Sequence, residues 1–250
     1  MSHALKAALT SNPSRVELLQ VWGADMSPVD AARVSVSAEQ PNPTPAPLSL
    51  RGEQARLIYE PRAQATNPAD RRLLNYLIEH GHTSTLEHAG ATFSIEAPLF
   101  VARQIMRHRT LSFNEISRRY TSDGLKVWTP TASDLREQHA RRLQCSTGEP
   151  IEDTATAQNL AAKIEAHHLR ALTLYQDLID AGVAREVARA VLPVATLTRL
   201  WLSGNLLNLI KMIKLRTEEH AQPETAAVAR AMLDALAPYF PSTLNAAGLI

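Results

Sequence analysis

Helix signals dominate the second half of the chain and limit it to a helix-rich fold. Hydrophobic residues recur there at helical spacing, and Gly182, Pro193 and Pro223 stand where such a pattern stops or starts. Glycine favours the position after a helix, and proline cannot continue one. The helices expected in this half are 131–144, 154–181, 183–192, 203–215 and 224–236.

Strand signals are concentrated in the first half. Residues 91–96 alternate between apolar and polar side chains, as a half-buried strand does, and the apolar run at 16–21 also favours a strand. Residues 194–202 are compatible with a third strand. Shorter helices, each starting beside a proline, are expected at 27–36, 67–80 and 98–107. The pattern predicts an α+β fold in which residues 1–250 form a helix-rich single domain around a small, mostly antiparallel sheet.

A proline-rich segment interrupts the first half. Between about residues 37 and 66 the periodicity disappears, and prolines occupy every second position from 41 to 47. Proline lacks a backbone donor and excludes both a helix interior and a central strand. We therefore expect an exposed loop inserted into the domain. It either decorates the surface or covers the entrance of a cleft, and the first role is favoured.

The charge balance and the cysteine content exclude several classes of protein. The chain carries 26 Lys and Arg against 25 Asp and Glu, which argues against a protein that coats nucleic acid or a membrane. Its single cysteine excludes an intrachain disulfide. The sequence shows neither a secretory signal nor an apolar run of about 18 residues, so a cytoplasmic protein is expected.

Phosphate recognition in this chain has to come from side chains. The nine glycines are scattered and form neither of the two common glycine-rich phosphate loops. In contrast, residues 103–119 hold five arginines and one histidine against a single acid, Glu115. Arginine binds phosphate through paired hydrogen bonds and stacks on flat rings. The segment therefore fits an anionic, aromatic ligand such as a nucleotide.

Two other interpretations of residues 103–119 stay open. One is a solvated basic face, which is less favoured here than for most charge runs because Asn, Ser and Glu are interspersed among the arginines. An RNA-binding module would need aromatic stacking, for which only Phe113 and Tyr120 are at hand. On the expected helix 98–107, Gln104, Arg107 and His108 are spaced to share one face.

Other reactive residues give weaker signals. Residues 80–88 contain three His and one Glu at a spacing that fits no zinc motif. We expect no metal there and favour hydrogen bonds from some of these histidines to a helix end. Cys145 has no histidine paired with it, which favours a non-functional thiol. The basic helix faces at 185–189 and 211–216 are compatible, on spacing alone, with ordinary surfaces.

The sequence RHRTLSFNEISRRY, residues 107–120, resembles the flavin-dependent thymidylate synthases. Their signature is Arg-His-Arg followed by seven residues and a Ser, which here is Arg107-His108-Arg109 and Ser117. Further similar segments follow in chain order. They are AARVS (31–35), HGHTSTLEH (80–88), APLFVARQ (97–104), REVARAVLP (185–193) and LRTEEHAQ (215–222). The resemblance covers residues 16–241 apart from the proline-rich segment.

This resemblance implies a homotetramer with active sites at the subunit interfaces. It also implies FAD as cofactor, with 5,10-methylenetetrahydrofolate as carbon donor and NADPH as reductant, in the conversion of dUMP to dTMP. Nucleic acid and membranes are not among the implied partners. Neither a glycine-rich loop nor a cysteine nucleophile is needed, which agrees with the missing glycine motifs and with Cys145.

Site residues follow from the resemblance position by position. The implied dUMP contacts are Gln104, Arg107, Glu115, Ser117, Arg119, Arg189 and Arg216. Arg216 is also the implied catalytic residue, which polarises the uracil ring. The implied FAD contacts are Ser84, Arg107, His108, Arg109, Glu115, Asn205, Leu206, Leu207 and Lys211. Lys211 stands where the family usually has Asn, so it either weakens that contact or meets a flavin phosphate.

Overall fold

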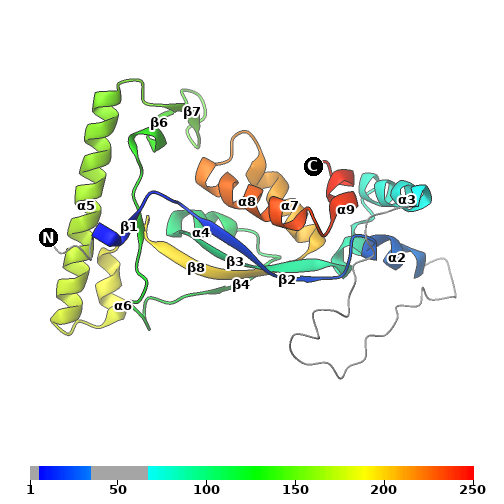
Figure 1. Ribbon diagram of the computed structural model, residues 1–250, viewed down its shortest axis with the longest axis horizontal. Helices are drawn as coiled ribbons and strands as arrows, with labels where there is room; N and C mark the ends of the chain where they lie inside the picture. The colour runs from blue at the N-terminus through cyan, green and yellow to red at the C-terminus, as the bar shows by residue number, and fades with distance from the viewer. Residues whose placement is uncertain (1–5, 35–66) are drawn as a thin grey trace.

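The computed structural model describes residues 6–34 and 67–250, with an antiparallel sheet of four strands at its centre. The strands are β2 (Arg15–Trp22), β3 (Gly90–Pro98), β8 (Leu197–Asn205) and β4 (Ser112–Glu115), in the order β2-β3-β8-β4. The two central strands pair along their whole length, from Gly90 opposite Asn205 to Pro98 opposite Leu197. Figure 1 shows this sheet running through the middle of the molecule.

Gly90 allows a close approach at one end of the central strands. A Cβ atom at this position would lie 2.3 Å from the carbonyl oxygen of Gly204 and 2.3 Å from the ring of Trp22. Any larger residue would push β3 away from β8, because two atoms cannot approach so closely. The glycine therefore holds the sheet together at the point where β8 passes into the next helix.

Three helices pack on one face of the sheet (Figure 1). They are α4 (Leu99–Ile105), α7 (Leu206–Thr217) and α8 (Pro223–Leu236). Phe93, Ile95, Leu202, Ile213 and Met232 are completely or almost completely buried in the core between these layers. Because α4 follows β3 directly and α7 follows β8 directly, the paired strands fix where both helices begin.

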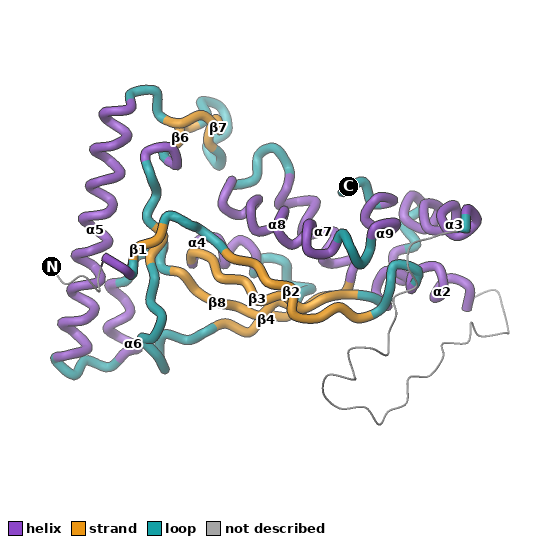
Figure 2. Tube along the Cα trace, in the orientation of Figure 1, coloured by secondary structure: helices purple, strands orange, loops and turns teal. Residues whose placement is uncertain are grey.

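The remaining elements gather at the two ends of the sheet (Figures 1 and 2). At one end lie β1 (Leu9–Thr10), β5 (Val127–Trp128), η3 (Ala132–Asp134), β6 (Arg136–Gln138), β7 (Ser146–Pro150), α5 (Thr154–Asp180), α6 (Arg185–Ala188) and η4 (Arg189–Val191). At the other lie α2 (Ser27–Val34), α3 (Pro68–Glu79), η2 (Thr83–His88) and α9 (Pro241–Ala246). Within the described residues, no helix is both long and apolar enough to cross a bilayer.

Asp25 connects the beginning of the chain to its C-terminal helix. Its buried carboxylate accepts hydrogen bonds from the backbone N–H groups of Ser242 (2.9 Å) and Thr243 (2.8 Å) at the start of α9. Asp25→Ala leaves these donors without their acceptor, so we expect a loss of about 3 kcal/mol in the free energy of unfolding. Urea denaturation measures it, with the exposed Asp234→Ala as control. Equal losses in the two variants would contradict this role.

The expected α+β class is confirmed, and so are the three strands, which are β2, β3 and β8. The helix predicted at 131–144 is wrong. Thr131 and Asp134 do cap a helix start, but only the single turn of η3 follows before Arg136 extends as β6 toward an ion pair with Glu224. Tertiary contacts thus override the local signal there.

Two further helix predictions need correction. The helix predicted at 98–107 ends at Ile105, because the chain turns back at 106–111 to enter β4. Arg107 and His108 therefore lie in this turn and not on a helix face shared with Gln104. The helix predicted at 183–192 is divided into α6 and η4. The expected loop at 37–66 lies outside the described residues.

Candidate active site

A guanidinium and an imidazole meet where α4 and α7 end. Arg216 belongs to the last turn of α7, and His108 to the turn after α4. The Nε atom of Arg216 donates a hydrogen bond to Nε2 of His108 (3.0 Å), and its Nη2 donates to the carbonyl oxygen of Gln104 (2.8 Å). These contacts fix the plane of the guanidinium. Its Nη1 atom has no hydrogen-bond partner among the described residues, so it is available to a ligand.

The contact with Arg216 determines the protonation state of His108. A guanidinium only donates hydrogen bonds, so Nε2 of His108 must carry the lone pair that accepts one, and the imidazole is neutral in this arrangement. Burial, and secondarily the charge of Arg216, lower the pKa of His108 below its ordinary value of 6.5. The geometry and the direction of the pKa shift therefore agree.

This lowered pKa makes stability depend on pH. Below pH 6.5 the unfolded chain binds a proton at His108 that the folded chain resists, so the free energy of unfolding falls as the pH drops toward the folded pKa. We expect His108→Gln to flatten this slope, as measured by urea denaturation between about pH 5 and 8. Buried His168, whose pKa is also lowered, accounts for a remaining slope. An unchanged slope in His108→Gln would contradict the prediction.

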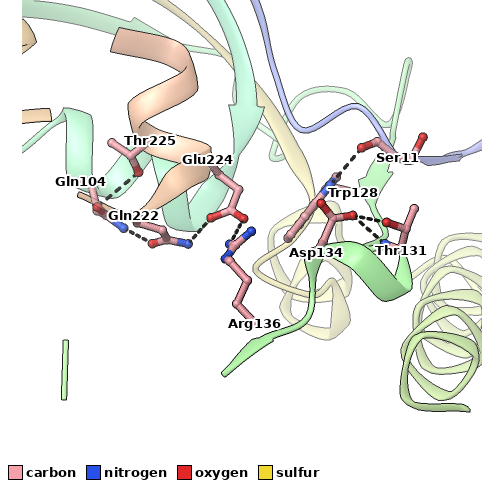
Figure 3. A network of polar contacts seen from close by, with 9 residues as sticks. All are labelled: Ser11, Gln104, Trp128, Thr131, Asp134, Arg136, Gln222, Glu224 and Thr225. Carbon is pink, nitrogen blue, oxygen red and sulfur yellow. Dashed lines mark hydrogen bonds and ion pairs between the residues drawn. The ribbon is translucent and has the colours of Figure 1, made fainter. Parts of the chain in front are cut away.

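Gln104 begins a chain of polar contacts, which Figure 3 shows. Its side-chain nitrogen donates to Oε1 of Gln222, and its side-chain oxygen accepts a hydrogen bond from the hydroxyl of Thr225 (3.2 Å). Gln222 in turn donates to Glu224 (2.9 Å), which is paired with Arg136. The chain of contacts extends from α4 through the start of α8 to β6.

A second group of candidate residues surrounds a pocket of 250 Å³ at the end of β4. Glu115, Ser117 and Arg189 line this pocket. The carboxylate of Glu115 accepts a hydrogen bond from Thr198 (2.6 Å). Arg119 forms an exposed ion pair with Glu186 (3.3 Å), whose backbone carbonyl also accepts a hydrogen bond from Arg189 (3.4 Å). Four of the predicted dUMP contacts are thus assembled around one region.

The two groups lie toward opposite ends of β4. Gln104, Arg107 and His108 precede this strand, whereas Ser117 follows it. An extended chain from residue 112 to residue 117 spans roughly 16 Å. No hydrogen bond or ion pair links the two groups within the part of the chain that the structure describes. The two groups are therefore not joined by a direct polar contact. We call the group around Gln104, His108 and Arg216 the first half-site and the group around Glu115, Ser117 and Arg189 the second half-site.

The residues implied as FAD contacts differ in what they offer a ligand. Leu206 and Leu207 are buried in the core, so only their backbone atoms can reach a cofactor. Asn205 caps α7 by accepting a hydrogen bond from the backbone of Asn208 (3.0 Å), which leaves its amide nitrogen available. Exposed side chains are offered by Ser84, Arg107, Arg109 and Lys211.

Arg107 and Arg109 have no counter-ion among the described residues, as is also true of the nearby exposed Arg103 and Lys214. Neither Arg107 nor Arg109 forms a side-chain hydrogen bond or ion pair with another described residue, and the same is true of Lys211. An exposed arginine that has no partner within the protein keeps its hydrogen-bond donors free for a ligand. Such charged donors form strong hydrogen bonds with phosphate oxygens. This donor set fits the two phosphates of a dinucleotide.

The other sequence candidates behave as ordinary structural residues. His80 makes a hydrogen bond from Nδ1 to the carbonyl oxygen of Tyr76 (3.0 Å) at the end of α3, which confirms the favoured helix-terminal role. Among the described residues, no cluster of three His, Cys, Asp or Glu could hold a metal ion. The Nδ1 atom of His139, near Cys145, accepts backbone N–H groups of Arg141 and Arg142 and is not free to act as its base.

Sequence reasoning missed several residues of the first half-site. Thr225, Glu224 and Arg136 contact Gln104 directly or through Gln222. Glu224 gave only the signal of an acid in the first turn of a helix, which usually serves the helix dipole. Arg136 fell within the wrongly predicted helix, so no local signal could have found it.

Comparison with known sequences identifies related proteins. The family model described as "Thymidylate synthase complementing protein" matches residues 17–242. A flavin-dependent thymidylate synthase from Thermotoga neapolitana is 35% identical over 84% of this chain and 79% of its own length. Another, from Pseudothermotoga lettingae, is 34% identical over 91% of this chain and 87% of its own.

Solved structures give a matching result. A UMP/dUMP methylase, PolB from Streptomyces cacaoi, bound with 5-Br UMP, superposes with a TM-score of 0.76. It is 32% identical to this chain, and the match covers 95% of this chain and 94% of the other. The same protein bound with 5-Br dUMP gives a TM-score of 0.75 and 33% identity, with 95% of each chain covered.

Proposed function

The chain belongs to the flavin-dependent thymidylate synthase family, and on that premise we propose that it converts dUMP to dTMP. In this proposal 5,10-methylenetetrahydrofolate donates the carbon, and NADPH supplies the reducing equivalents through bound FAD. The active unit is a homotetramer whose sites lie between subunits.

The observation that carries this proposal is the fixed guanidinium of Arg216. Carbon 5 of uracil attacks a carbon donor only when electron density moves into the ring, and negative charge then develops on a carbonyl oxygen. A cation that is already oriented, in a partly buried site, stabilises such charge without having to reorganise. His108 and the carbonyl of Gln104 hold Arg216 in this way and leave its Nη1 for the substrate.

The surrounding side chains support the assignment of a flavin cofactor. The unpaired Arg107 and Arg109, with Lys211, are suited to the phosphates of FAD. Ser84 and the free amide nitrogen of Asn205 add neutral donors. The flavin supplies the hydride chemistry when it is bound, so the protein itself has to bind, orient and polarise.

Assembly from two half-sites supports the oligomeric part of the proposal. The dUMP contacts assigned in this proposal fall in both half-sites, and no direct polar contact joins the two. They are Glu115, Ser117, Arg119 and Arg189 in the second half-site, and Gln104, Arg107 and Arg216 in the first. A neighbouring copy that brings its second half-site against the first would complete the set. In this arrangement each dUMP is bound by two protomers.

Release of tritium from carbon 5 of dUMP tests the proposal. The assay contains NADPH and methylenetetrahydrofolate, with and without added FAD, and dTMP is identified as the product. Release that requires NADPH is the expected result. Release only with added FAD would indicate a weak flavin site and direct attention to Lys211. No release under any condition, together with salt-dependent RNA binding, would overturn the proposal in favour of the basic segment as an RNA-binding surface.

UMP is a second candidate substrate because of the similarity to PolB, whose name includes both nucleotides. The same assay with tritiated UMP compares the two as competing substrates. A higher kcat/KM for dUMP supports thymidylate synthesis. A higher kcat/KM for UMP would assign the chain to ribonucleotide methylation.

A further inference from the structure

We propose that Glu224 is a positioning residue that fixes the orientation of the Gln104 side-chain amide, acting through Gln222. The inference rests on the proposed function, in which Gln104 contacts dUMP. It adds a task for the start of α8 and for Arg136, neither of which touches the substrate in that proposal.

The contacts of Glu224 have a fixed hydrogen-bonding direction. Its carboxylate is buried, and one of its oxygens meets Arg136, which can only donate. The other oxygen faces Gln222 at 2.9 Å. Because a carboxylate only accepts hydrogen bonds, Gln222 must turn its nitrogen toward Glu224.

The direction of this hydrogen bond then fixes the orientation of the next amide, Gln104. With its nitrogen toward Glu224, Gln222 turns its oxygen toward Gln104, which must answer with its own nitrogen. The oxygen of Gln104 consequently faces Thr225, whose hydroxyl donates to it (3.2 Å). Each contact in Figure 3 between Arg136 and Gln104 has a defined direction, and the direction originates at Glu224.

The orientation of the Gln104 amide matters to a ligand because the amide still has a hydrogen-bond donor available. One N–H of its amide has no acceptor among the described residues. A nucleotide presents mainly acceptor oxygens, on its phosphate and on its base, so a free N–H is useful to it. If the amide were rotated by half a turn, an oxygen would face those oxygens and repel them.

The Arg136–Glu224 pair also explains how a charge is tolerated at this place. The side chain of Glu224 is 5% exposed and that of Arg136 is 18% exposed, so both are largely withdrawn from water. Such a pair contributes little net stability compared with apolar residues of the same size, but it imposes direction on the groups around it. The role of this ion pair is therefore to orient the amides of Gln222 and Gln104.

Glu224→Gln is the first test, because it preserves shape while removing polarity. A glutamine at this position can donate or accept, so neither Gln222 nor Gln104 would be held in one orientation. We expect the KM for dUMP to rise about tenfold, which is the cost of one misplaced hydrogen bond, with kcat at saturating dUMP nearly unchanged. The matched control is Glu219→Gln, at a side chain that is 91% exposed.

Glu224→Gln removes the charged partner of Arg136, which is a reason for this variant to fail to fold. Gln222→Met covers that case. Methionine has nearly the same length as glutamine, and this change interrupts the chain of contacts while leaving the ion pair in place. The same rise in KM for dUMP is expected. A thermal melt of each variant without ligand shows whether it is folded.

A double-mutant cycle with Gln104→Ala separates this inference from the proposed function. If Glu224 acts through Gln104, then Glu224→Gln adds no further rise in KM once Gln104 has been truncated. Full additivity of the two effects would overturn the inference. So would an unchanged KM in both Glu224→Gln and Gln222→Met, even though Gln104→Ala raises it and the proposed function stands. A wild-type chain that fails to methylate either nucleotide would instead overturn the proposed function.

Discussion

Arg216→Ala is expected to lower the rate of dTMP formation about 10³-fold while the protein keeps its fold. The guanidinium is the only group in the first half-site that combines a fixed charge, two anchoring hydrogen bonds and a donor left for the substrate, within the part of the chain described here. Alanine removes all three features. Arg216→Lys keeps a charge but lacks the planar fork that spans His108 and Gln104, so it should recover little activity.

Tritium release and dTMP formation measure this effect at saturating dUMP. The matched control is Lys214→Ala, which removes an exposed cation from the same turn of α7. Its activity should stay near that of the wild-type protein. Thermal unfolding of both variants checks the fold. Near-normal turnover in Arg216→Ala would contradict the catalytic role and leave Arg216 with only a structural role, as the hydrogen-bond partner of His108.

Arg216 also shows where prediction from sequence stops. Its spacing from Lys211 and Lys214 is typical of an ordinary surface helix, and only the resemblance to a family selected it. The contact that distinguishes it is with His108, which lies 108 positions earlier in the chain. Local periodicity carries no information about such a distance, whereas the β3–β8 pairing that brings the two helices together does.

Secondary structure was predictable where side-chain pattern and tertiary environment agree. The alternation in 91–96 matches the two faces of β3, and the cap at Asn67 with the following proline does begin α3. At 131–144 they disagree, since the capping signal of Thr131 is real but a buried ion pair at Arg136 draws the chain away. The same ion pair is also part of the chain of polar contacts that ends at Gln104. One long-range contact therefore explains both the wrong helix at 131–144 and the failure to predict the residues that contact Gln104.

Mixing two inactive variants is expected to restore activity, and this is the most direct consequence of the separated half-sites. Arg216→Ala damages the first half-site, and Arg189→Ala damages the second. Each variant alone should lose most of its activity, about 10²-fold or more for Arg189→Ala, because an unpaired phosphate or base contact in the site is costly. In a hybrid oligomer, however, some sites would combine the intact first half-site of an Arg189→Ala chain with the intact second half-site of an Arg216→Ala chain.

The expected recovery follows from the geometry of a shared site. If every site takes its first half from one protomer and its second from another, random assembly of equal amounts leaves about a quarter of the sites intact. Co-expression of the two variants with different tags, followed by purification on both tags, isolates the hybrids for the tritium-release assay. A mixture of Arg216→Ala with itself, carried through the same steps, provides the baseline. Activity at that baseline in the hybrid would mean that both half-sites serve the same protomer, and would contradict the interface arrangement while leaving the role of Arg216 in place.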